Sequence, residues 1–283
     1  MKLLVIDGNS IINRAFYGIR LLSNKKGIFT NAVTGFLNIY LKLIAAYKPD
    51  GAAAAFDLKA PTFRHKAYDG YKAGRKGMPD ELAMQLPYVK DILRAMGVKV
   101  LECEGYEADD ILGTLAHACD ERGFECVIAT GDRDSFQLIT DRVCVNLAST
   151  KEDILYTPEK IREVYGVSPA EMLEVKALMG DSSDNIPGLK RGVGPKRALK
   201  IINEDVNQWI EDEKLQDEYA RNMKLISFDC IPKEIEISIN TVINNLTYGE
   251  PDTKKYFKFI QMSGLAELMN TFTDYVNLLK KVH

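Results

Sequence analysis

The sequence Tyr106-Glu107-Ala108-Asp109-Asp110 runs directly into Ile111, Leu112, Leu115 and Ala116, an apolar set with helical spacing. The three acids therefore occupy the first turn of a predicted helix. Acids are common at helix N-termini because they offset the helix macrodipole, and this triplet alone fits that interpretation. The positions of acids elsewhere in the chain favour a second interpretation, in which the triplet belongs to a functional site.

Apolar runs elsewhere in the chain end in aspartates. Residues 3–6 run into Asp7, residues 52–56 into Asp57, and residues 126–131 into Asp132, with Asp134 two positions later. Short continuous apolar runs between helical patterns are typical of buried parallel strands. In open α/β sheets the ligand site lies beyond the carboxyl ends of the strands. We therefore expect these aspartates to meet in one crevice, within reach of the Glu107 helix.

A loop at residues 180–185 adds two more acids, which makes nine: Asp7, Asp57, Glu107, Asp109, Asp110, Asp132, Asp134, Asp181 and Asp184. Nine carboxylates in one crevice raise each other's pKa unless cations neutralise them. Oxygen ligands without a nearby histidine favour Mg²⁺ or Mn²⁺ over Zn²⁺. Enough acids for two ions suggest the paired-metal arrangement of phosphoryl displacement. The pattern predicts metal-dependent phosphodiester chemistry.

The composition is consistent with a nucleic-acid substrate. The chain has 283 residues, 37 basic and 40 acidic, for a formal charge of -3. Once the nine crevice acids are set aside, the rest of the chain is net basic, which suits a polyanion held against metal ions. Five cysteines without a Cys-x-x-Cys pair predict reduced thiols in a cytoplasmic protein. Met1 leads directly into the first strand, so we expect no signal peptide, and no apolar run reaches membrane length, so we expect no membrane span.

The alternation of strands and helices predicts an α/β fold with a mainly parallel central sheet flanked by helices. We place this domain at residues 1–156 and a mostly helical half at residues 157–283. A helix is expected over about 79–96, and further helices near 206–213, 215–227, 253–262 and 265–281. A strand is predicted at 233–239. We read the elements beyond residue 203 as packing support.

A basic segment follows the second strand, at residues 59–76. It carries Lys59, Arg64, Lys66, Lys72, Arg75 and Lys76 against the single acid Asp69, with Tyr68 and Tyr71 between them. Charges for phosphates and rings for bases are what single-stranded nucleic acid requires. The alternative is a solvated basic loop. Glycines at 70, 74 and 77 suggest a mobile gate or clamp.

A second basic segment contains closely spaced glycines between two predicted helices. It runs Pro187-Gly188-Leu189-Lys190-Arg191-Gly192-Val193-Gly194-Pro195-Lys196-Arg197. Such a turn exposes backbone N–H groups at a helix N-terminus, which is a natural phosphate site. The alternative is an ordinary helix hairpin with a wet basic face. The acid pair directly before it favours DNA binding.

The ordered motifs make the chain resemble the 5′-nuclease family, in particular the small 5′→3′ exonuclease (flap endonuclease) domain of bacterial DNA polymerase I and its free-standing relatives. The resemblance covers about residues 4–202 and rests on six motifs. These are Val5-Ile6-Asp7-Gly8-Asn9-Ser10, Ala55-Phe56-Asp57, Phe63-Arg64 with Tyr71-Lys72-Ala73-Gly74-Arg75, Glu107-Ala108-Asp109-Asp110, Thr130-Gly131-Asp132-Arg133-Asp134, and residues 180–188.

The resemblance implies a PIN-like fold, a helical arch at about 60–95 and a helix–turn–helix at about 170–203. It implies one Mg²⁺ held by Asp7, Asp57, Glu107, Asp109 and Asp110 and a second by Asp132, Asp134, Asp181 and Asp184, with Mn²⁺ able to substitute. Tyr71, Lys72 and Arg75 would lie over the site and Arg14 near the scissile phosphate. Expected DNA contacts are Arg64, Lys76, Gly188, Lys190, Arg191, Gly192, Gly194, Lys196 and Arg197, with K⁺ at the turn.

One departure is the pair Lys190-Arg191, which stands where the family usually has one residue, so the turn is one residue longer. The expected activity is hydrolysis of DNA with a 5′ flap, or a 5′ end next to duplex, in replication and repair. The expected setting is a monomer at the nucleoid of a bacterial cytoplasm, with a DNA polymerase as partner. The other interpretations are a PIN-like ribonuclease, a DNA-binding protein without catalysis, and a haloacid-dehalogenase-like phosphatase. The last would need an aspartate at Asn9.

Overall fold

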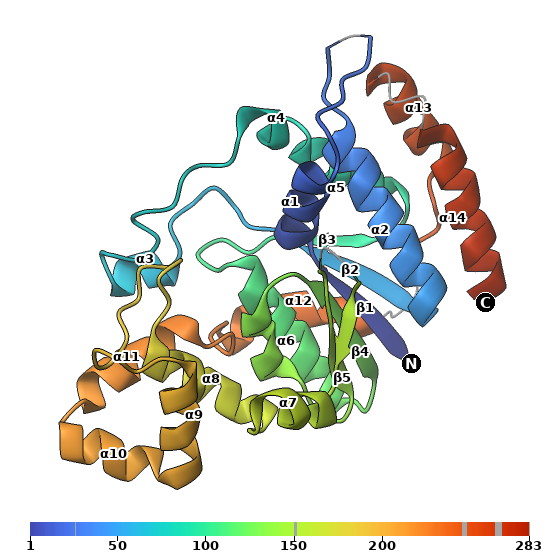
Figure 1. Cartoon of the computed structure of the whole chain (residues 1–283). Helices are drawn as coiled ribbons and strands as arrows, with labels where there is room; N and C mark the ends of the chain where they lie inside the picture. The colour runs from blue at the N-terminus through green and yellow to red at the C-terminus, as the bar shows by residue number, and fades with distance from the viewer. Residues whose placement is uncertain (26, 150–151, 245–247, 264–267, 283) are drawn as a thin grey trace.

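The computed structural model describes residues 1–25, 27–149, 152–244, 248–263 and 268–282. Its described residues form a six-stranded sheet at the centre of the molecule (Figure 1), in the order β3-β2-β1-β4-β5-β6. The strands are β1 (Lys2–Asp7), β2 (Gly51–Ala55), β3 (Lys99–Leu101), β4 (Glu125–Thr130), β5 (Val143–Leu147) and β6 (Ile154–Tyr156). All neighbouring strands are parallel except β5 and β6, which confirms the predicted mainly parallel α/β sheet.

The central strands are continuous apolar runs because both faces of the sheet are covered. Residues 3–6 of β1 are fully buried. The chain runs from β1 outward through β2 to β3, then returns to the other side of β1 with β4 and β5. The strand order therefore reverses between β1 and β4, and a crevice forms beyond the carboxyl ends of strands at such a switch point. Asp7 ends β1 at this place.

Two helical layers sandwich the sheet (Figure 1). One face carries α1 (Gly8–Gly18), α2 (Asn31–Tyr47), α5 (Leu86–Ala95), α13 (Thr253–Ser263) and α14 (Met269–Val282). The other face carries α6 (Ala108–Glu121), the 3₁₀ helix η1 (Arg133–Leu138), α7 (Pro158–Tyr165) and α12 (Lys233–Asn244). The separate apolar cores of the two faces hold the sheet rigid, so the strand ends are fixed in space.

A helical group lies at one end of the sheet (Figure 1). It consists of α8 (Pro169–Met179), α9 (Pro195–Glu204), α10 (Val206–Glu213) and α11 (Gln216–Ile226). These helices share a small apolar core around Leu178, Ala198 and Ile201. The helix α8 also packs against η1, which brings the loop after α8 to the carboxyl edge of the sheet.

The expected strand at 233–239 is wrong, because these residues begin α12. Apolar and polar residues alternate there, but Ile239, Val242 and Ile243 are buried at helical spacing and α12 packs on α6. The expected helix at 79–96 is divided into α4 (Asp80–Ala83) and α5. The expected arch contains the short α3 (Phe63–Ala67), while residues 68–79 form turns and irregular chain. Among the described residues, no helix is long and apolar enough to cross a membrane.

Candidate active site

The aspartates at the strand ends are fixed by hydrogen bonds. Asp7 accepts from the backbone N–H of Ser10 at 2.9 Å and from the Thr130 hydroxyl at 2.7 Å. Asp57 accepts from the backbone N–H of Ala108 at 2.7 Å and from the side-chain amide of Asn9 at 2.6 Å. The bond to Ala108 joins the end of β2 to the first turn of α6. The strands and α6 therefore present their carboxylates as one rigid group.

Eight of the nine predicted acids line a single pocket at this edge of the sheet. They are Asp7, Asp57, Glu107, Asp109, Asp132, Asp134, Asp181 and Asp184. They come from β1, the segment after β2, the start of α6, the start of η1 and the loop after α8, which are far apart in the sequence. The side chains of Tyr71, Lys72, Arg75 and Lys76 line the same pocket. Convergence of the strand ends therefore gathers most of the predicted site.

Burial and mutual repulsion act strongly on the inner carboxylates. Burial, then the charges of Asp7, Asp132 and Asp57, raise the pKa of Asp109 well above its usual value. Burial also raises the pKa of Asp7 to about 6, against the opposing hydrogen bonds from Ser10 and Thr130. The pKa of Asp57 is raised mainly by burial as well. A cation among these acids would relieve this repulsion.

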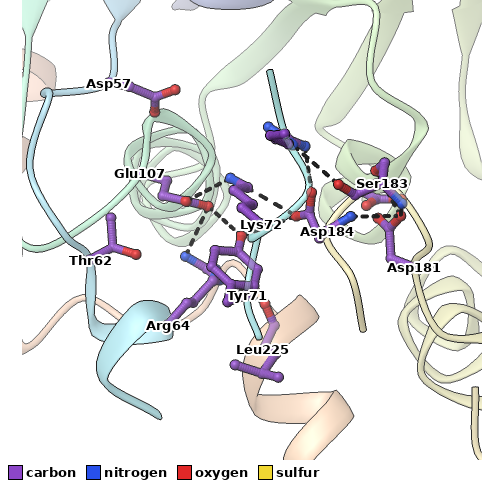
Figure 2. A network of polar contacts seen from close by, with 12 residues as sticks. Asp57, Thr62, Arg64, Tyr71, Lys72, Glu107, Asp181, Ser183, Asp184 and Leu225 are labelled. Atoms are coloured by element: carbon purple, nitrogen blue, oxygen red, sulfur yellow. Dashed lines mark hydrogen bonds and ion pairs between the residues drawn. The ribbon is translucent and has the colours of Figure 1, made fainter. Parts of the chain in front are cut away.

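Basic side chains from the segment between α3 and α4 reach into the pocket (Figure 2). Lys72 Nζ lies 2.6 Å from Glu107 Oε1, and Arg75 Nη2 lies 2.5 Å from Asp184 Oδ1. The Tyr71 hydroxyl donates to Glu107 at 2.8 Å and to Asp184 at 3.1 Å. Burial alone would raise the pKa of Glu107. The positive charges of Lys72 and the nearby Arg64 outweigh burial and lower this pKa below its usual value. This segment therefore joins the α6 side of the pocket to the loop after α8.

The backbone fixes that segment against the loop after α8. Lys72 has φ 55°, in the left-handed region, and its N–H donates to the Asp184 carbonyl at 2.9 Å. The Asn185 side-chain amide donates to the Gly70 carbonyl at 2.8 Å. A left-handed non-glycine residue is energetically unfavourable, so the surrounding contacts must hold it.

A third basic side chain, Lys176 of α8, holds the outer acids together. Its ammonium group lies 2.9 Å from Asp134 Oδ1 and 3.1 Å from Asp181 Oδ2. The sequence analysis missed Lys176, because a lysine near the C-terminal end of a helix is explained by the macrodipole alone. Burial and the charge of Asp132 raise the pKa of Asp134 to about 6, against the opposing charge of Lys176.

Arg64 and Asp110 are placed differently from the prediction. Arg64 is 1% exposed and forms a two-pronged ion pair with Asp110, with both N–O distances at 2.7 Å. The guanidinium group also donates to the carbonyls of Leu225 and Ser227. Asp110 in turn accepts from the Glu107 N–H at 2.8 Å. Arg64 also lines the carboxylate pocket, with Nη1 3.5 Å from Glu107 Oε2, but these buried contacts occupy its guanidinium group, so its expected contact with DNA stays a prediction. Asp110 is not among the residues that line the pocket.

Arg14 is also held away from the pocket lining. Its guanidinium group pairs with Asp153 at 2.7 Å and donates to the Ser149 carbonyl at 2.6 Å. Both partners belong to the connection between β5 and β6. The neighbouring residues Asn9, Ser10 and Asn13 of α1 line the pocket instead. Asn9 and Ser10 belong to the first motif of the family resemblance, residues 5–10, but the sequence analysis gave them no role in the site.

The glycine turn joins α8 to α9 at the surface. A side chain at Gly188 would meet the Met179 carbonyl at 2.5 Å, so glycine permits close packing of the turn on α8. Gly192 has φ 85°, a left-handed conformation that glycine adopts readily. Gly194 is the N-cap of α9. Arg191, Lys196 and Arg197 are exposed, while Lys190 pairs with Glu213 of α10.

The donor set fits divalent cations that prefer oxygen. The pocket acids supply only carboxylate oxygens, which suits Mg²⁺ or Mn²⁺, and the raised pKa of Asp109 shows negative charge that a cation would stabilise. In the described part of the chain, no three Asp, Glu, His or Cys side chains are arranged as they stand to hold a metal ion. Four of the pocket carboxylates form ion pairs with basic side chains, namely Glu107 with Lys72, Asp184 with Arg75, and both Asp134 and Asp181 with Lys176.

The sequence matches two families in succession. Residues 2–166 match the N-terminal resolvase-like domain of 5′-3′ exonucleases, and residues 167–226 match their C-terminal SAM fold. The 5′-3′ exonuclease of Aquifex aeolicus is 34% identical over 273 residues, covering 94% of this chain and 93% of that protein. DNA polymerase I of Caldicellulosiruptor bescii is 47% identical over 208 residues, covering 72% of this chain and 24% of the polymerase.

The chain spans about a quarter to a third of the length of the DNA polymerase I relatives that it matches. Among solved structures, a flap endonuclease of bacteriophage T5 in complex with DNA and metal ions has the same fold. Its TM-score is 0.67 at 19% identity, covering 93% of this chain and all of that one. Most of the acids of the carboxylate pocket thus lie within residues 2–166, which match the N-terminal domain of 5′-3′ exonucleases. The chain belongs to the 5′-3′ exonuclease family, a family of phosphodiester hydrolases.

Proposed function

We propose that the chain hydrolyses DNA as a metal-dependent 5′→3′ exonuclease and 5′ flap endonuclease. The observation that carries this proposal is the pocket of eight carboxylates, crossed by Tyr71, Lys72 and Arg75. A phosphodiester is repelled by carboxylates alone, so the pocket needs cations to accept it. The fold shared with a flap endonuclease that has been solved with DNA and metal ions supports the same substrate.

Two groups of acids would hold two divalent ions. Asp7, Asp57, Glu107 and Asp109 form the first group, and Asp132, Asp134, Asp181 and Asp184 form the second. The predicted assignment of Asp110 is dropped because Arg64 already pairs with it in the interior. When bound, such ions activate the attacking water and stabilise the attacking and leaving oxygens.

The protein side chains supply position and charge. Thr130, Asn9 and the backbone of α6 keep the inner carboxylates in place before substrate arrives. Lys72 and Arg75 come from an irregular segment and form short ion pairs with pocket acids. We propose that DNA draws them onto the scissile phosphate, where they stabilise charge that develops during cleavage. Tyr71, buried beneath them, keeps this segment attached to Glu107.

The glycine turn would hold the duplex. Lys196 and Arg197 lie in the first turn of α9, where cations are unfavourable for the helix macrodipole. A bound phosphate at this N-terminus would offset that cost. We therefore propose that Gly188, Arg191, Gly192, Gly194, Lys196 and Arg197 contact the DNA backbone, with Lys76 at the pocket mouth. A K⁺ ion at this turn is part of the proposal, tested by replacing KCl with NaCl.

The relatives support a proposal for the cellular setting. DNA polymerase I relatives carry a similar sequence as part of a longer chain, which supports a DNA polymerase as partner in replication and repair. We propose that the protein acts as a monomer at the bacterial nucleoid. The division into a catalytic part at residues 1–156 and a DNA-binding part from residue 157 remains part of this proposal.

The decisive assay uses a labelled duplex with a 5′ single-stranded flap, compared with blunt duplex and with the same flap in RNA. We expect cleavage near the flap base with Mg²⁺ or Mn²⁺, and binding without cleavage in Ca²⁺. Binding without cleavage under every metal condition would identify a DNA-binding protein. Preferred cleavage of RNA would identify a ribonuclease, and full activity after exhaustive chelation would contradict the metal mechanism.

A further inference from the structure

Lys176 differs from the other basic residues of the pocket in how it is held. It lies on α8 between the buried residues Val175 and Ala177, and α8 packs against η1, α9 and α11. Lys72 and Arg75 instead lie on irregular chain between α3 and α4. The ammonium group of Lys176 is therefore placed by a rigid helix, and substrate binding would not easily move its backbone.

The ammonium group joins two acids from different elements. Asp134 belongs to η1, and Asp181 lies just after the C-cap of α8. At 2.9 and 3.1 Å, Lys176 contacts one oxygen of each. In the described ranges, no other Lys or Arg forms an ion pair with either acid. In the first group of acids, Glu107 pairs with Lys72 of the irregular segment at 2.6 Å. None of the described Lys or Arg side chains forms an ion pair with the other three acids of that group, Asp7, Asp57 and Asp109.

An ammonium ion and a divalent ion compete for the same carboxylate oxygens. A lysine head group is a compact point charge with three donors, so it can satisfy two carboxylates at once. A divalent ion entering between Asp134 and Asp181 must displace the ammonium group or share these oxygens with a positive charge a few ångströms away. At an effective dielectric constant of about 20, such repulsion is strong enough to change binding many-fold.

We propose that Lys176 is a built-in counter-cation of the Asp134–Asp181 pair, which weakens binding of a divalent ion to this half of the pocket. It also keeps the two carboxylates together before an ion arrives. Lys176 is thus a positioning residue that acts through these acids. This inference rests on the proposed metal-dependent function and adds to it the residue that makes the two halves of the pocket unequal.

The test is calorimetric titration of the full chain with Mn²⁺, without DNA, together with electron paramagnetic resonance counts of free Mn²⁺. The wild type is expected to bind one ion more tightly than a second. Lys176→Met removes the charged head group and keeps an unbranched side chain that is one atom shorter. It should tighten the weaker ion by about tenfold or more and change the tighter ion by less than twofold. The half-saturating Mg²⁺ concentration for cleavage should fall in parallel.

Two further variants control for the charge. Lys176→Arg keeps the charge and should bind Mn²⁺ like the wild type. Lys160→Met removes a comparable lysine, which pairs with Glu163 at 3.0 Å on α7, and should change neither ion. Thermal melting reports folding. If Lys176→Met does not fold, the neutral and polar Lys176→Gln replaces it, with the same tightening expected.

The outcomes separate the inference from the proposed function. A weaker ion that binds Lys176→Met no more tightly than the wild type, while the wild type still cleaves flaps with Mg²⁺, overturns the inference alone. A wild type that binds no Mn²⁺ and cleaves without metal overturns both. Tightening in both Lys176→Met and Lys160→Met would show a general charge effect, and would also overturn the specific role of Lys176.

Discussion

Arg64 and Asp110 are almost completely buried, although both stand in charged sequence motifs. Removal of one partner leaves the other charge unpaired in the interior. We therefore expect Arg64→Met to lower the free energy of unfolding by about 3–5 kcal/mol. The exposed Lys66→Met should change it by less than about 0.5 kcal/mol. Urea denaturation measures both, and Arg64→Met with Asp110→Asn should recover part of the loss. A loss under about 1 kcal/mol would contradict a buried pair.

Lys72 and Arg75 differ from Arg64, because their ion pairs lie in the pocket that the substrate would enter. Their replacement should therefore affect catalysis. Replacement of either by alanine should slow the chemical step more than it weakens binding, because charge near a developing oxyanion acts mainly in the transition state. Single-turnover cleavage at saturating enzyme measures the first quantity, and titration in Ca²⁺ the second. Wild-type single-turnover rates with reduced affinity would instead make the pair a simple phosphate clamp.

At this scale the sequence predicted the acids better than their partners. The strand-end aspartates follow from short apolar runs, because parallel strands bring their carboxyl ends together. The sequence Glu107-Ala108-Asp109-Asp110 does not by itself show that Asp109 lines the pocket and Asp110 does not. A capping box at Glu107 and Asp110 was nevertheless readable from their spacing, and it turns Asp110 back toward the helix start. The buried state of Arg64 depends on Leu225 and Ser227, which are distant in sequence.

At the scale of elements, the lengthened glycine turn gives a prediction that distinguishes neighbouring residues. Arg191 is exposed, whereas Lys190 pairs with Glu213 of α10. Each phosphate contact on duplex DNA contributes about -0.9 to the slope of log K against log[salt]. Arg191→Ala should therefore make the slope shallower by about one unit. Lys190→Ala should change it less, because its charge is already neutralised. Binding in Ca²⁺ at several KCl concentrations measures the slope.

The comparison with Lys190→Ala makes the test specific to the turn. Single-turnover cleavage of bound substrate should stay near wild type in both variants, because the turn lies outside the carboxylate pocket. An unchanged slope in Arg191→Ala would mean that its side chain remains in solvent when DNA binds. A larger effect from Lys190→Ala would mean that DNA breaks the pair with Glu213.

Two helices beyond residue 203 were predicted closely, whereas the alternating residues 233–239 were not. The α10 and α11 helices lie close to the expected 206–213 and 215–227. Residues 233–239 alternate like a strand, but α12 covers α6, so tertiary packing decided the structure. The segment at 68–79 was expected within an arch, yet its contacts to the loop after α8 hold it in turns.

At the scale of the whole molecule, the chain beyond residue 226 completes both cores. Tyr256, Phe272 and Tyr275 fill the face that carries α2, and α12 covers α6. The Tyr275 hydroxyl donates to the Met96 carbonyl at 2.7 Å. A chain that ends at residue 226, where the matched families end, should therefore be much less stable or fail to fold.

Thermal melting of the shortened chain beside the full chain tests this prediction. The full-length variant Tyr275→Ala offers a milder test, and it should lose about 3–5 kcal/mol, as is usual for a buried aromatic side chain replaced by alanine. Exposed Met269→Ala on the same helix is the control, with little change expected. If the shortened chain melts within a few degrees of the full chain, the C-terminal helices are packing that the core does not need.

In the proposed mechanism the carboxylate pocket performs the cleavage, so the double variant Asp132→Asn with Asp134→Asn should remove it. The change keeps the size of both side chains and removes two charges from the pocket. Single-turnover cleavage of a 5′ flap in Mg²⁺ should be abolished, while flap binding in Ca²⁺ stays near wild type or becomes tighter. Cleavage retained within about tenfold of wild type, only ~1.4 kcal/mol in barrier, would contradict the account and place the chemistry elsewhere.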